Sequence, residues 1–369
     1  MTVRTASEGT AVERPPQTTG VVDTDIHPVV LPKAITSRLN EPWRSRFERF
    51  GHRVASPPMI YPRTRNGGMR LDSWPEGGVP GSDLGLVRAQ LLDEFGIVRG
   101  ILIPLQSHGY GAVDPEFSLA LCHALNECVR EEWLDPEPRL STSICVPHES
   151  PEAAAGEIEH YAADPRFVQV LLPTGGETSL GRAKYWPLYA AAADAGLPIA
   201  VHTGGIERHR GDGWPSFYLE QHIWYSNVMA GVVISLICEG VFERFPTLRV
   251  VLVEGGVSWA GPLMWAMDAG WSKLREDVPH LRRPPSEYLR EHFWFTTQPI
   301  EEPENPRHLA AAIEHTGMTD RILFASDYPH WDFDSPATAL RDLPRHLRRQ
   351  VMAGNARRLY GLADDGRGR

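Results

Sequence analysis

The chain of 369 residues is 42% hydrophobic, which is enough for one large α/β barrel, a fold that exceeds the usual domain length without splitting. Its formal charge of -10 at pH 7 argues against nucleic acid as a main partner and favours a small-molecule substrate. Four cysteines without Cys-x-x-Cys spacing indicate neither a disulfide scaffold nor a thiolate zinc site.

The two ends of the chain differ from its middle. Residues 1–19 are polar and contain prolines, which predicts a disordered leader rather than a signal peptide, and residues 362–369 are predicted to be a tail. No apolar run reaches the roughly 18 to 20 residues needed to cross a bilayer. We therefore expect a cytoplasmic protein without a membrane partner, with residues 20–361 forming a single domain.

Strands and helices are predicted to alternate along this domain. Short apolar runs predict strands at 20–26, 97–104, 140–146, 167–172, 197–201, 248–253, 293–297 and 322–325. Helical spacing and capping residues predict helices at 83–95, 114–133, from 150, 185–195, 223–245, 262–275 and up to 360. Eight strands with seven helical connections predict a (β/α)8 TIM barrel with a parallel sheet.

Residues 29–82 interrupt this alternation after the first strand. They are rich in Pro, Gly and Arg and show little periodicity, and such a long segment inside a compact domain is usually functional or a linker. We expect a lid insertion over the barrel mouth, and a second mini-domain is the alternative. The loop at 204–218 should fold with it, and the apolar lining would be Trp43, Met59, Trp74 and Trp214.

Several strands end in side chains that can bind a metal. Asp25 and His27 stand at the end of the first strand and alternate so that both point to the same face. His202 ends the fifth strand, Glu254 the sixth and Asp327 the eighth. Because the C-terminal ends of barrel strands meet at one rim, we expect these side chains to converge on a metal site. Glu254 could instead act as a general base.

Two further histidines compete for a place at this rim. His222 stands near the start of a long helix, where a capping role is the alternative to metal ligation. His330 follows Asp327 and could bind the metal, support a ligand or face the substrate. We predict catalytic roles for Glu254 and His330.

Other residues are expected to contact the substrate. Arg63 and Arg65 in the first loop could bind a carboxylate or phosphate, although arginines on exposed loops are usually only solvated. The remaining candidates follow predicted strands or stand beside predicted ligands: His108, Trp214, Gln298 and Trp331.

Five motifs together resemble the amidohydrolase-fold family that includes aminocarboxymuconate-semialdehyde decarboxylase and the resorcylate decarboxylases. They are Asp25-x-His27, Val201-His-Thr-Gly, Glu254-Gly-Gly-Val-Ser-Trp, Ser326-Asp-Tyr-Pro-His-Trp-Asp332 and Gly354-Asn-Ala-Arg-Arg-Leu-Tyr. The resemblance implies that His27, His202 and Asp327 hold one metal. Asp25 replaces the first histidine of the family's His-x-His pair, and Glu254 stands where the family has a histidine after strand six.

Both exchanges replace imidazole by carboxylate, which favours hard ions such as iron or manganese over zinc. The pattern also resembles a branch of the family from bacterial terpenoid biosynthesis, exemplified by platensimycin, that works as a non-haem diiron monooxygenase. This resemblance implies two Fe(II) ions held by seven ligands, namely Asp25, His27, His202, His222, Glu254, Asp327 and His330.

We therefore expect a diiron monooxygenase of secondary metabolism that makes part of an antibiotic. It would hydroxylate an unactivated carbon of a bulky apolar substrate, such as a terpenoid or an acyl-CoA-linked compound. Its partners would be O2 and an electron donor, and the chain could form a homo-oligomer. The alternative is a hydrolase or decarboxylase of a small carboxylated substrate with one Zn or Mn ion. A binding protein on a decayed barrel is the non-enzymatic alternative.

Overall fold

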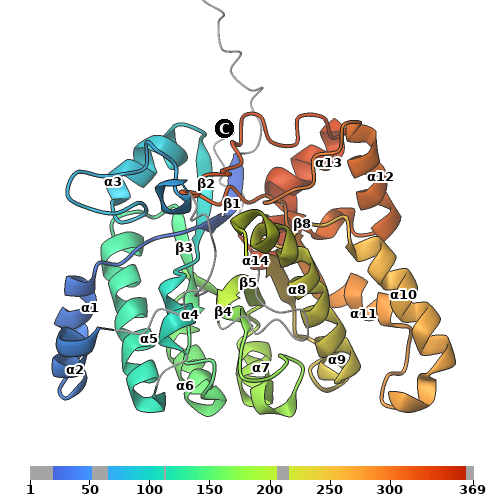
Figure 1. Ribbon diagram of the computed structural model, residues 1–369, viewed down its shortest axis with the longest axis horizontal. Helices are drawn as coiled ribbons and strands as arrows, with labels where there is room; N and C mark the ends of the chain where they lie inside the picture. The colour runs from blue at the N-terminus through green and yellow to red at the C-terminus, as the bar shows by residue number, and fades with distance from the viewer. Residues whose placement is uncertain (1–19, 52–64, 112–113, 206–215, 363–369) are drawn as a thin grey trace, which may run out of the picture.

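Eight parallel strands form one sheet in the order β1 to β8, and helices surround it. The computed structural model describes residues 20–51, 65–111, 114–205 and 216–362. Figure 1 shows the strands in the middle of the molecule with the long helices around them. The strands are β1 Val21–Ile26, β2 Ile97–Leu102, β3 Leu140–Cys145, β4 Phe167–Gly175, β5 Ile199–Gly205, β6 Val250–Val253, β7 Phe293–Thr296 and β8 Ile322–Leu323.

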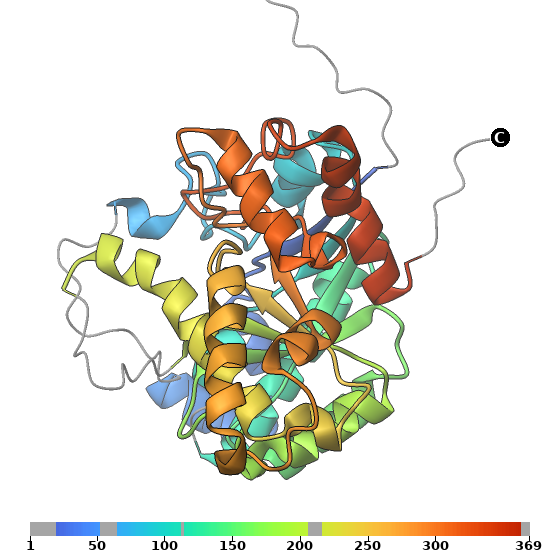
Figure 2. The ribbon, with the colours of Figure 1, turned by 90° about the vertical axis from the view of Figure 1, so that its right-hand side faces the viewer.

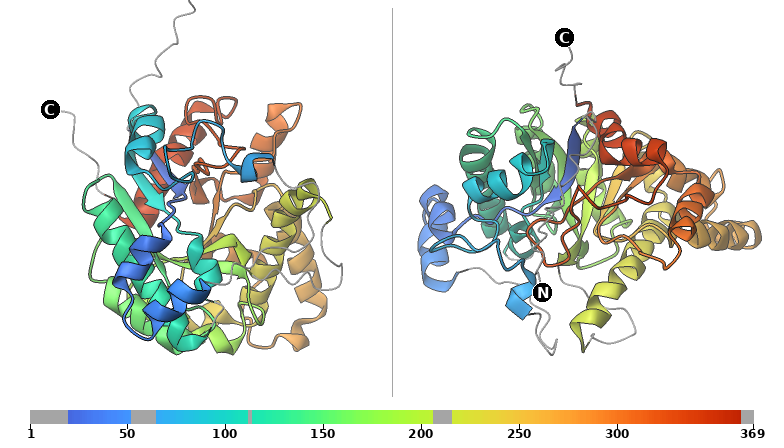
Figure 3. Two further views of the ribbon diagram at one scale, coloured as in Figure 1. Left: turned by 60° about the vertical axis from the view of Figure 1, so that its left-hand side comes forward. Right: turned by 90° about the horizontal axis from the view of Figure 1, so that it is seen from above.

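The helices follow the strands in the outer layer (Figures 2 and 3). The α-helices are α1 Pro32–Arg38, α2 Trp43–Phe50, α3 Leu84–Val87, α4 Gln106–Tyr110, α5 Pro115–Val129, α6 Pro151–Tyr161, α7 Trp186–Asp194, α8 Tyr218–Cys238, α9 Val241–Arg244, α10 Ala260–Lys273, α11 Pro285–His292, α12 Pro306–Thr316, α13 Arg345–Arg349 and α14 Asn355–Tyr360. Three of them continue as π-helix, in η2 Arg88–Asp93, η3 Arg130–Leu134 and η7 Gln350–Gly354. Short 3-10 helices are η1 Arg65–Gly68, η4 Ala183–Tyr185, η5 Arg275–Asp277 and η6 Thr319–Arg321.

Hydrogen bonds between the first and last strands close the sheet. The backbone N–H of Thr24 donates to the carbonyl of Phe324 at 3.0 Å, and that of His27 donates to the carbonyl of Tyr328 at 2.8 Å. The β8 ladder with β7 covers only Ile322 and Leu323, yet the chain beyond it still pairs with β1. The (β/α)8 barrel predicted from the sequence is confirmed.

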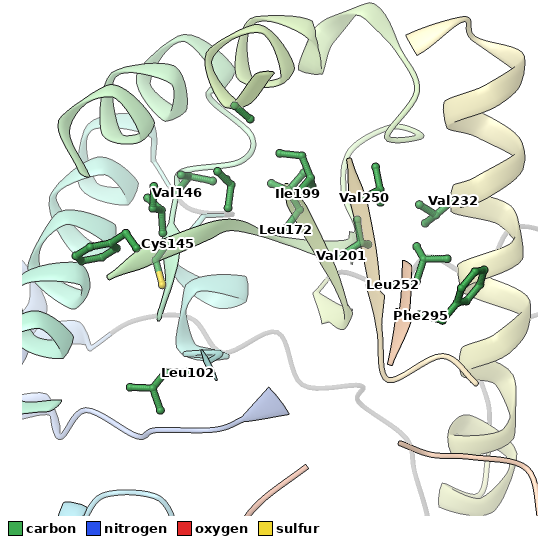
Figure 4. Close-up of a cluster of buried hydrophobic side chains, with 14 of the residues drawn as sticks. Leu102, Cys145, Val146, Leu172, Ile199, Val201, Val232, Val250, Leu252 and Phe295 are labelled. Carbon is green, nitrogen blue, oxygen red and sulfur yellow. The ribbon is translucent and has the colours of Figure 1, made fainter. Parts of the chain in front are cut away.

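Alternation along the strands produces two apolar cores. In β6, Val250 and Leu252 belong to the layer between strands and helices, whereas Val251 and Val253 belong to the barrel interior. Figure 4 shows Leu252 facing Val232 of α8 in the outer layer. The polar residues at the strand ends therefore lie at the C-terminal end of a largely apolar interior.

The helix α8 is long and apolar enough by length and composition alone to cross a membrane. Its residues Met229, Val233 and Leu236 are buried and belong to the core between strands and helices. This packing is that of an outer barrel helix, which passes the same test.

The segment after β1 differs from the predicted structureless lid. Residues 32–50 form α1 and α2, and the Trp43 ring stacks on Phe117 of α5 at 5.4 Å between ring centroids. Trp43 thus packs on the outer helix layer, with Ile35 and Phe47 buried beside it, rather than lining the barrel mouth. Met59 lies outside the described residues, and Trp74 is 48% exposed. A lid role for the rest of this segment stays a prediction.

Candidate metal centre

Four ligand-type side chains meet at the C-terminal end of the barrel. Asp25 and His27 come from β1 and the residue after it, His202 from β5, and Asp327 from the turn after β8. The Nε2 atom of His27 lies 3.2 Å from Oδ1 of Asp25 and 2.7 Å from Oδ1 of Asp327. The Nε2 atom of His202 lies 3.8 Å from Oδ2 of Asp25. All four residues are buried, so strands on different sides of the barrel supply one compact cluster.

Backbone carbonyls orient both imidazoles. The Nδ1 atom of His27 is 3.0 Å from the carbonyl oxygen of Ile103, and Nδ1 of His202 is 2.7 Å from that of Thr203. If Nδ1 carries the proton and donates to the carbonyl, the lone pair of Nε2 is free to bind a cation. Both Nε2 atoms face the carboxylates, which is the arrangement of histidine ligands in metal sites.

Several buried atoms of this cluster have no hydrogen-bond partner among the described residues. They are both carboxylate oxygens of Asp25, Oδ2 of Asp327 and Nε2 of His202. A buried carboxylate without a partner is costly, and a divalent cation would satisfy all of these atoms at once. The residues present therefore fit a metal ion.

Glu254 stands beside this cluster on a strained backbone. Its Oε2 lies 3.2 Å from Nε2 of His202 and accepts a hydrogen bond of 2.6 Å from the Thr203 hydroxyl. Glu254 has φ of 60° and Asp327 has φ of 58°, in the left-handed region that side chains rarely adopt. Such conformations concentrate at functional sites, and here both turn carboxylates toward the cluster.

His330 contacts the cluster from the turn after β8. Its Nδ1 atom lies 2.5 Å from Oδ1 of Asp327, and its ring centroid lies 4.7 Å from that of His27. The backbone of Met69 pairs with that of His330, so part of the segment after β1 supports this turn.

Burial and the close approach of several carboxylates shift the pKa values of the residues in the cluster. Burial, together with the negative charge of Asp327, raises the pKa of Asp25 and of Glu254 well above the usual range. Although burial opposes it, the Asp327 carboxylate raises the pKa of His330 to about 10. His330 and His27 in turn hold the pKa of Asp327 below its usual value, against the effect of burial. A cation would relieve the repulsion between the carboxylates.

His222 lies at the rim and pairs with a different acid. Its Nε2 atom is 3.2 Å from Oδ2 of Asp332, and its ring packs against Tyr218 and Trp331. Gln298 donates to the same Asp332 oxygen at 2.7 Å, and Trp331 is 51% exposed. These residues form a partly aromatic rim beside the cluster, and His222 as a metal ligand stays a prediction.

His108 from α4 approaches the cluster from the side of β2. Its ring centroid is 5.7 Å from that of His202, it is buried, and its Nε2 atom has no hydrogen-bond partner in the described part of the chain. Burial lowers the pKa of His108 to about 3, which keeps the imidazole neutral. It can therefore offer a neutral hydrogen-bonding group to a substrate.

Three of the predicted substrate contacts cannot be placed. Arg63 and Trp214 lie outside the described residues, and Arg65 opens η1 with a side chain that also lies outside them.

Two residues of the site were missed by the sequence analysis. Thr203 donates to Glu254, and Asp332 joins His222 to Gln298. Their sequence signal is position alone, because Thr203 follows His202 and Asp332 ends the motif that begins at Ser326.

Comparisons with known proteins agree with the barrel fold. A family model described as amidohydrolase matches residues 22–362. Gamma-resorcylate decarboxylase of Rhizobium sp. is 25% identical over 299 residues, which cover 76% of this chain and 88% of that protein. Two of the similar solved structures contain manganese, and each covers 93% of this chain. The first is a dihydroxybenzoic acid decarboxylase of Polaromonas sp. with bound manganese, which is 21% identical, with 97% of its chain covered and a TM-score of 0.67. The second is the 5-carboxyvanillate decarboxylase of Novosphingobium aromaticivorans with manganese, which is 18% identical, with 96% of its chain covered and a TM-score of 0.66.

These findings correct the predicted chemistry. The curated relatives are decarboxylases, so the predicted monooxygenase activity, its O2 and electron-donor partners and a role in antibiotic biosynthesis are wrong. Two Fe(II) ions are not supported either, since the similar solved structures named above hold manganese. The prediction of two ions rested on the number of ligand-type residues at the rim, and that number alone does not distinguish one metal ion from two.

Proposed function

Because the chain belongs to the amidohydrolase family, we propose that it is a decarboxylase of a small carboxylated substrate that depends on one divalent metal ion. The observation that carries this proposal is the cluster at the barrel end, where Asp25, His27 and His202 form one candidate ligand group and His27, Asp327 and His330 form a second. Buried oxygen atoms of Asp25 and Asp327 and Nε2 of His202 have no hydrogen-bond partner among the described residues. The decarboxylase relatives support the choice of reaction.

Two carboxylates and two imidazoles would hold the ion, a donor set that suits manganese or zinc. When bound, the ion would supply a Lewis acid that holds the anionic substrate. Backbone carbonyls of Ile103 and Thr203 would keep the Nε2 atoms of His27 and His202 turned toward it.

We assign the proton transfer to Glu254. Decarboxylation breaks the bond between carbon and carboxylate, releases CO2 and leaves an electron pair on carbon that must take up a proton. Glu254 is buried beside the cluster, with Oε2 3.2 Å from Nε2 of His202, so its carboxyl group lies close enough to the ion site to deliver this proton. The hydrogen bond with Thr203 fixes the position of the carboxyl group. We assign the transfer of protons toward the rim to His330, whose Nδ1 atom contacts Asp327.

The surrounding side chains favour a planar, hydroxylated aromatic acid as substrate. Trp331, Tyr218 and His222 supply aromatic faces at the rim. His108 Nε2 and the Oε1 atom of Gln298 are buried without hydrogen-bond partners among the described residues, and both could bind ring hydroxyl groups.

The test is release of CO2 from a panel of hydroxybenzoates by the manganese-loaded protein without air. We expect turnover without O2 or a reductant. Hydrolysis of ester or amide substrates with no CO2 release would favour the hydrolase alternative and overturn the proposal.

Glu254→Gln should lower kcat by about 10²- to 10⁴-fold, the usual contribution of a general acid, while manganese still binds. Glu132→Gln on the outer surface is the matched control and should leave kcat unchanged. Full activity in Glu254→Gln would contradict the assigned proton donor.

The cytoplasmic location stays a prediction, consistent with four cysteines that are all free thiols.

A further inference from the structure

A second group of ligand-type side chains lies on the outer helix layer, away from the barrel end. His123 and Glu127 are four residues apart and so share one face of α5, and His160 stands at the end of α6. One candidate ligand atom from each lies within 4.8 Å of the others. Figure 1 shows α5 and α6 as neighbours, and side-chain contacts join them.

A buried carboxylate anchors this group. Glu157 is only 7% exposed, and its Oε1 lies 3.2 Å from Nδ1 of His123. The hydroxyl of Tyr161 donates to Oε1 of Glu127 at 3.0 Å. The rings of His123 and His160 are 5.4 Å apart between centroids. The side chains of both helices are thus already held close together.

The charges around the group favour a cation. Glu127 and Glu157 contribute two carboxylates, and Glu131 lies next to them on η3. Arg130 pairs with Glu127 and lies 3.7 Å from Glu131. Glu131 also pairs with Arg38, so three carboxylates against two guanidinium groups leave one negative charge in excess.

We propose that His123, Glu127 and His160 bind a Zn²⁺ ion that links α5 to α6, with the Glu157 carboxylate orienting the His123 ring. Two imidazoles with carboxylate oxygens form a donor set that zinc takes in proteins. The ion would stabilise the outer layer and take no part in catalysis. The inference does not rest on the proposed decarboxylase activity.

The first test counts zinc on the full-length chain without a histidine tag. The protein is stripped with a chelator and equilibrated with buffered free zinc. The double variant His123→Gln/His160→Gln should bind one ion fewer per chain, with affinity at this site more than about 100-fold weaker, since even indirect partners of a ligand change affinity 10- to 100-fold. The control double variant His308→Gln/His315→Gln removes two exposed histidines of α12 and should bind as the wild type does. Equal zinc content in the two double variants would overturn the proposal.

The second test separates coordination from general surface charge. Glu127→Gln and Glu131→Gln remove the same charge from neighbouring positions, and only the first should weaken zinc binding. An equal loss in both variants would overturn the proposal. All titrations are repeated with His202→Gln as the parent, which removes the site at the barrel end. If the His202→Gln parent still binds zinc at the α5–α6 site, the two metal sites are independent, and failure of one proposal leaves the other testable.

Discussion

At the residue scale, the left-handed backbone of Asp327 makes a testable difference between two substitutions. Asparagine visits this region readily, whereas alanine there costs about 1–2 kcal/mol. We expect both Asp327→Asn and Asp327→Ala to lose metal and activity, but Asp327→Ala should be less stable by about that amount. Urea unfolding of the metal-free variants measures the difference between their free energies of unfolding. The same pair at exposed Asp320, where φ is negative, should show no such gap. Equal stability of the two Asp327 variants would contradict the strain.

The sequence predicts single residues well where the strand direction decides their position. Asp25, His27 and His202 could be placed at one barrel end because parallel strands end together. The sequence cannot show that His222 pairs with Asp332, since that contact depends on how α8 packs beside the turn after β8. The left-handed backbone conformation of Glu254 could likewise not be predicted from the sequence, although Gly255 and Gly256 after it indicated an irregular strand end.

At the element scale, Glu137 joins the helix before β2 to the start of β3. It accepts hydrogen bonds from Arg88 and Arg139, each at 2.8 Å, and is 4% exposed. Glu137→Gln should lower the free energy of unfolding at pH 7 by about 1.5–3 kcal/mol, the usual value for a hydrogen bond to a charged group. Chemical unfolding measures the change, and exposed Glu48→Gln is the control.

This contribution should depend on pH in a defined direction. The hydrogen bonds from Arg139 lower the pKa of Glu137 to about 2, so the folded state binds fewer protons than the unfolded state. The stabilisation is present above the ordinary pKa of a glutamate and is lost as the pH falls toward 2. The gap between wild type and Glu137→Gln should therefore shrink over that window, and a constant gap would contradict the mechanism.

The strands and most of the long helices were predicted, whereas α11 and α12 were missed although α12 has a capping asparagine and a proline in its first turn. The strands appear where apolar runs predicted them, because burial on both faces leaves little choice of residue. The predicted helix 223–245 begins earlier, at Tyr218, and breaks at Gly240, whose φ of 74° ends α8. Helices α1 and α2 were missed, because only a few buried residues such as Ile35 and Phe47 fix them against the outer layer.

At the scale of the whole molecule, the cluster connects distant walls of the barrel. Asp25 lies in β1 and His27 directly after it, and Asp327 follows β8, where the sheet closes. His202 lies in β5, four strands away. A metal ion bound to all four residues would cross-link strands that separate from one another when the chain unfolds. The ion therefore should stabilise the entire fold and not only the loops at the rim.

Manganese should raise the free energy of unfolding by about 2.7 kcal/mol at a hundredfold excess over its Kd, because it binds the folded chain alone. Urea unfolding with and without manganese measures this gain, and a chelator should reverse it. His202→Gln removes the ligand from the far wall and should abolish most of the gain, whereas His308→Gln at an exposed position should keep it. If His202→Gln is stabilised as much as the wild type, the ion is held by the β1 and β8 side alone, and the cross-link between opposite walls does not exist.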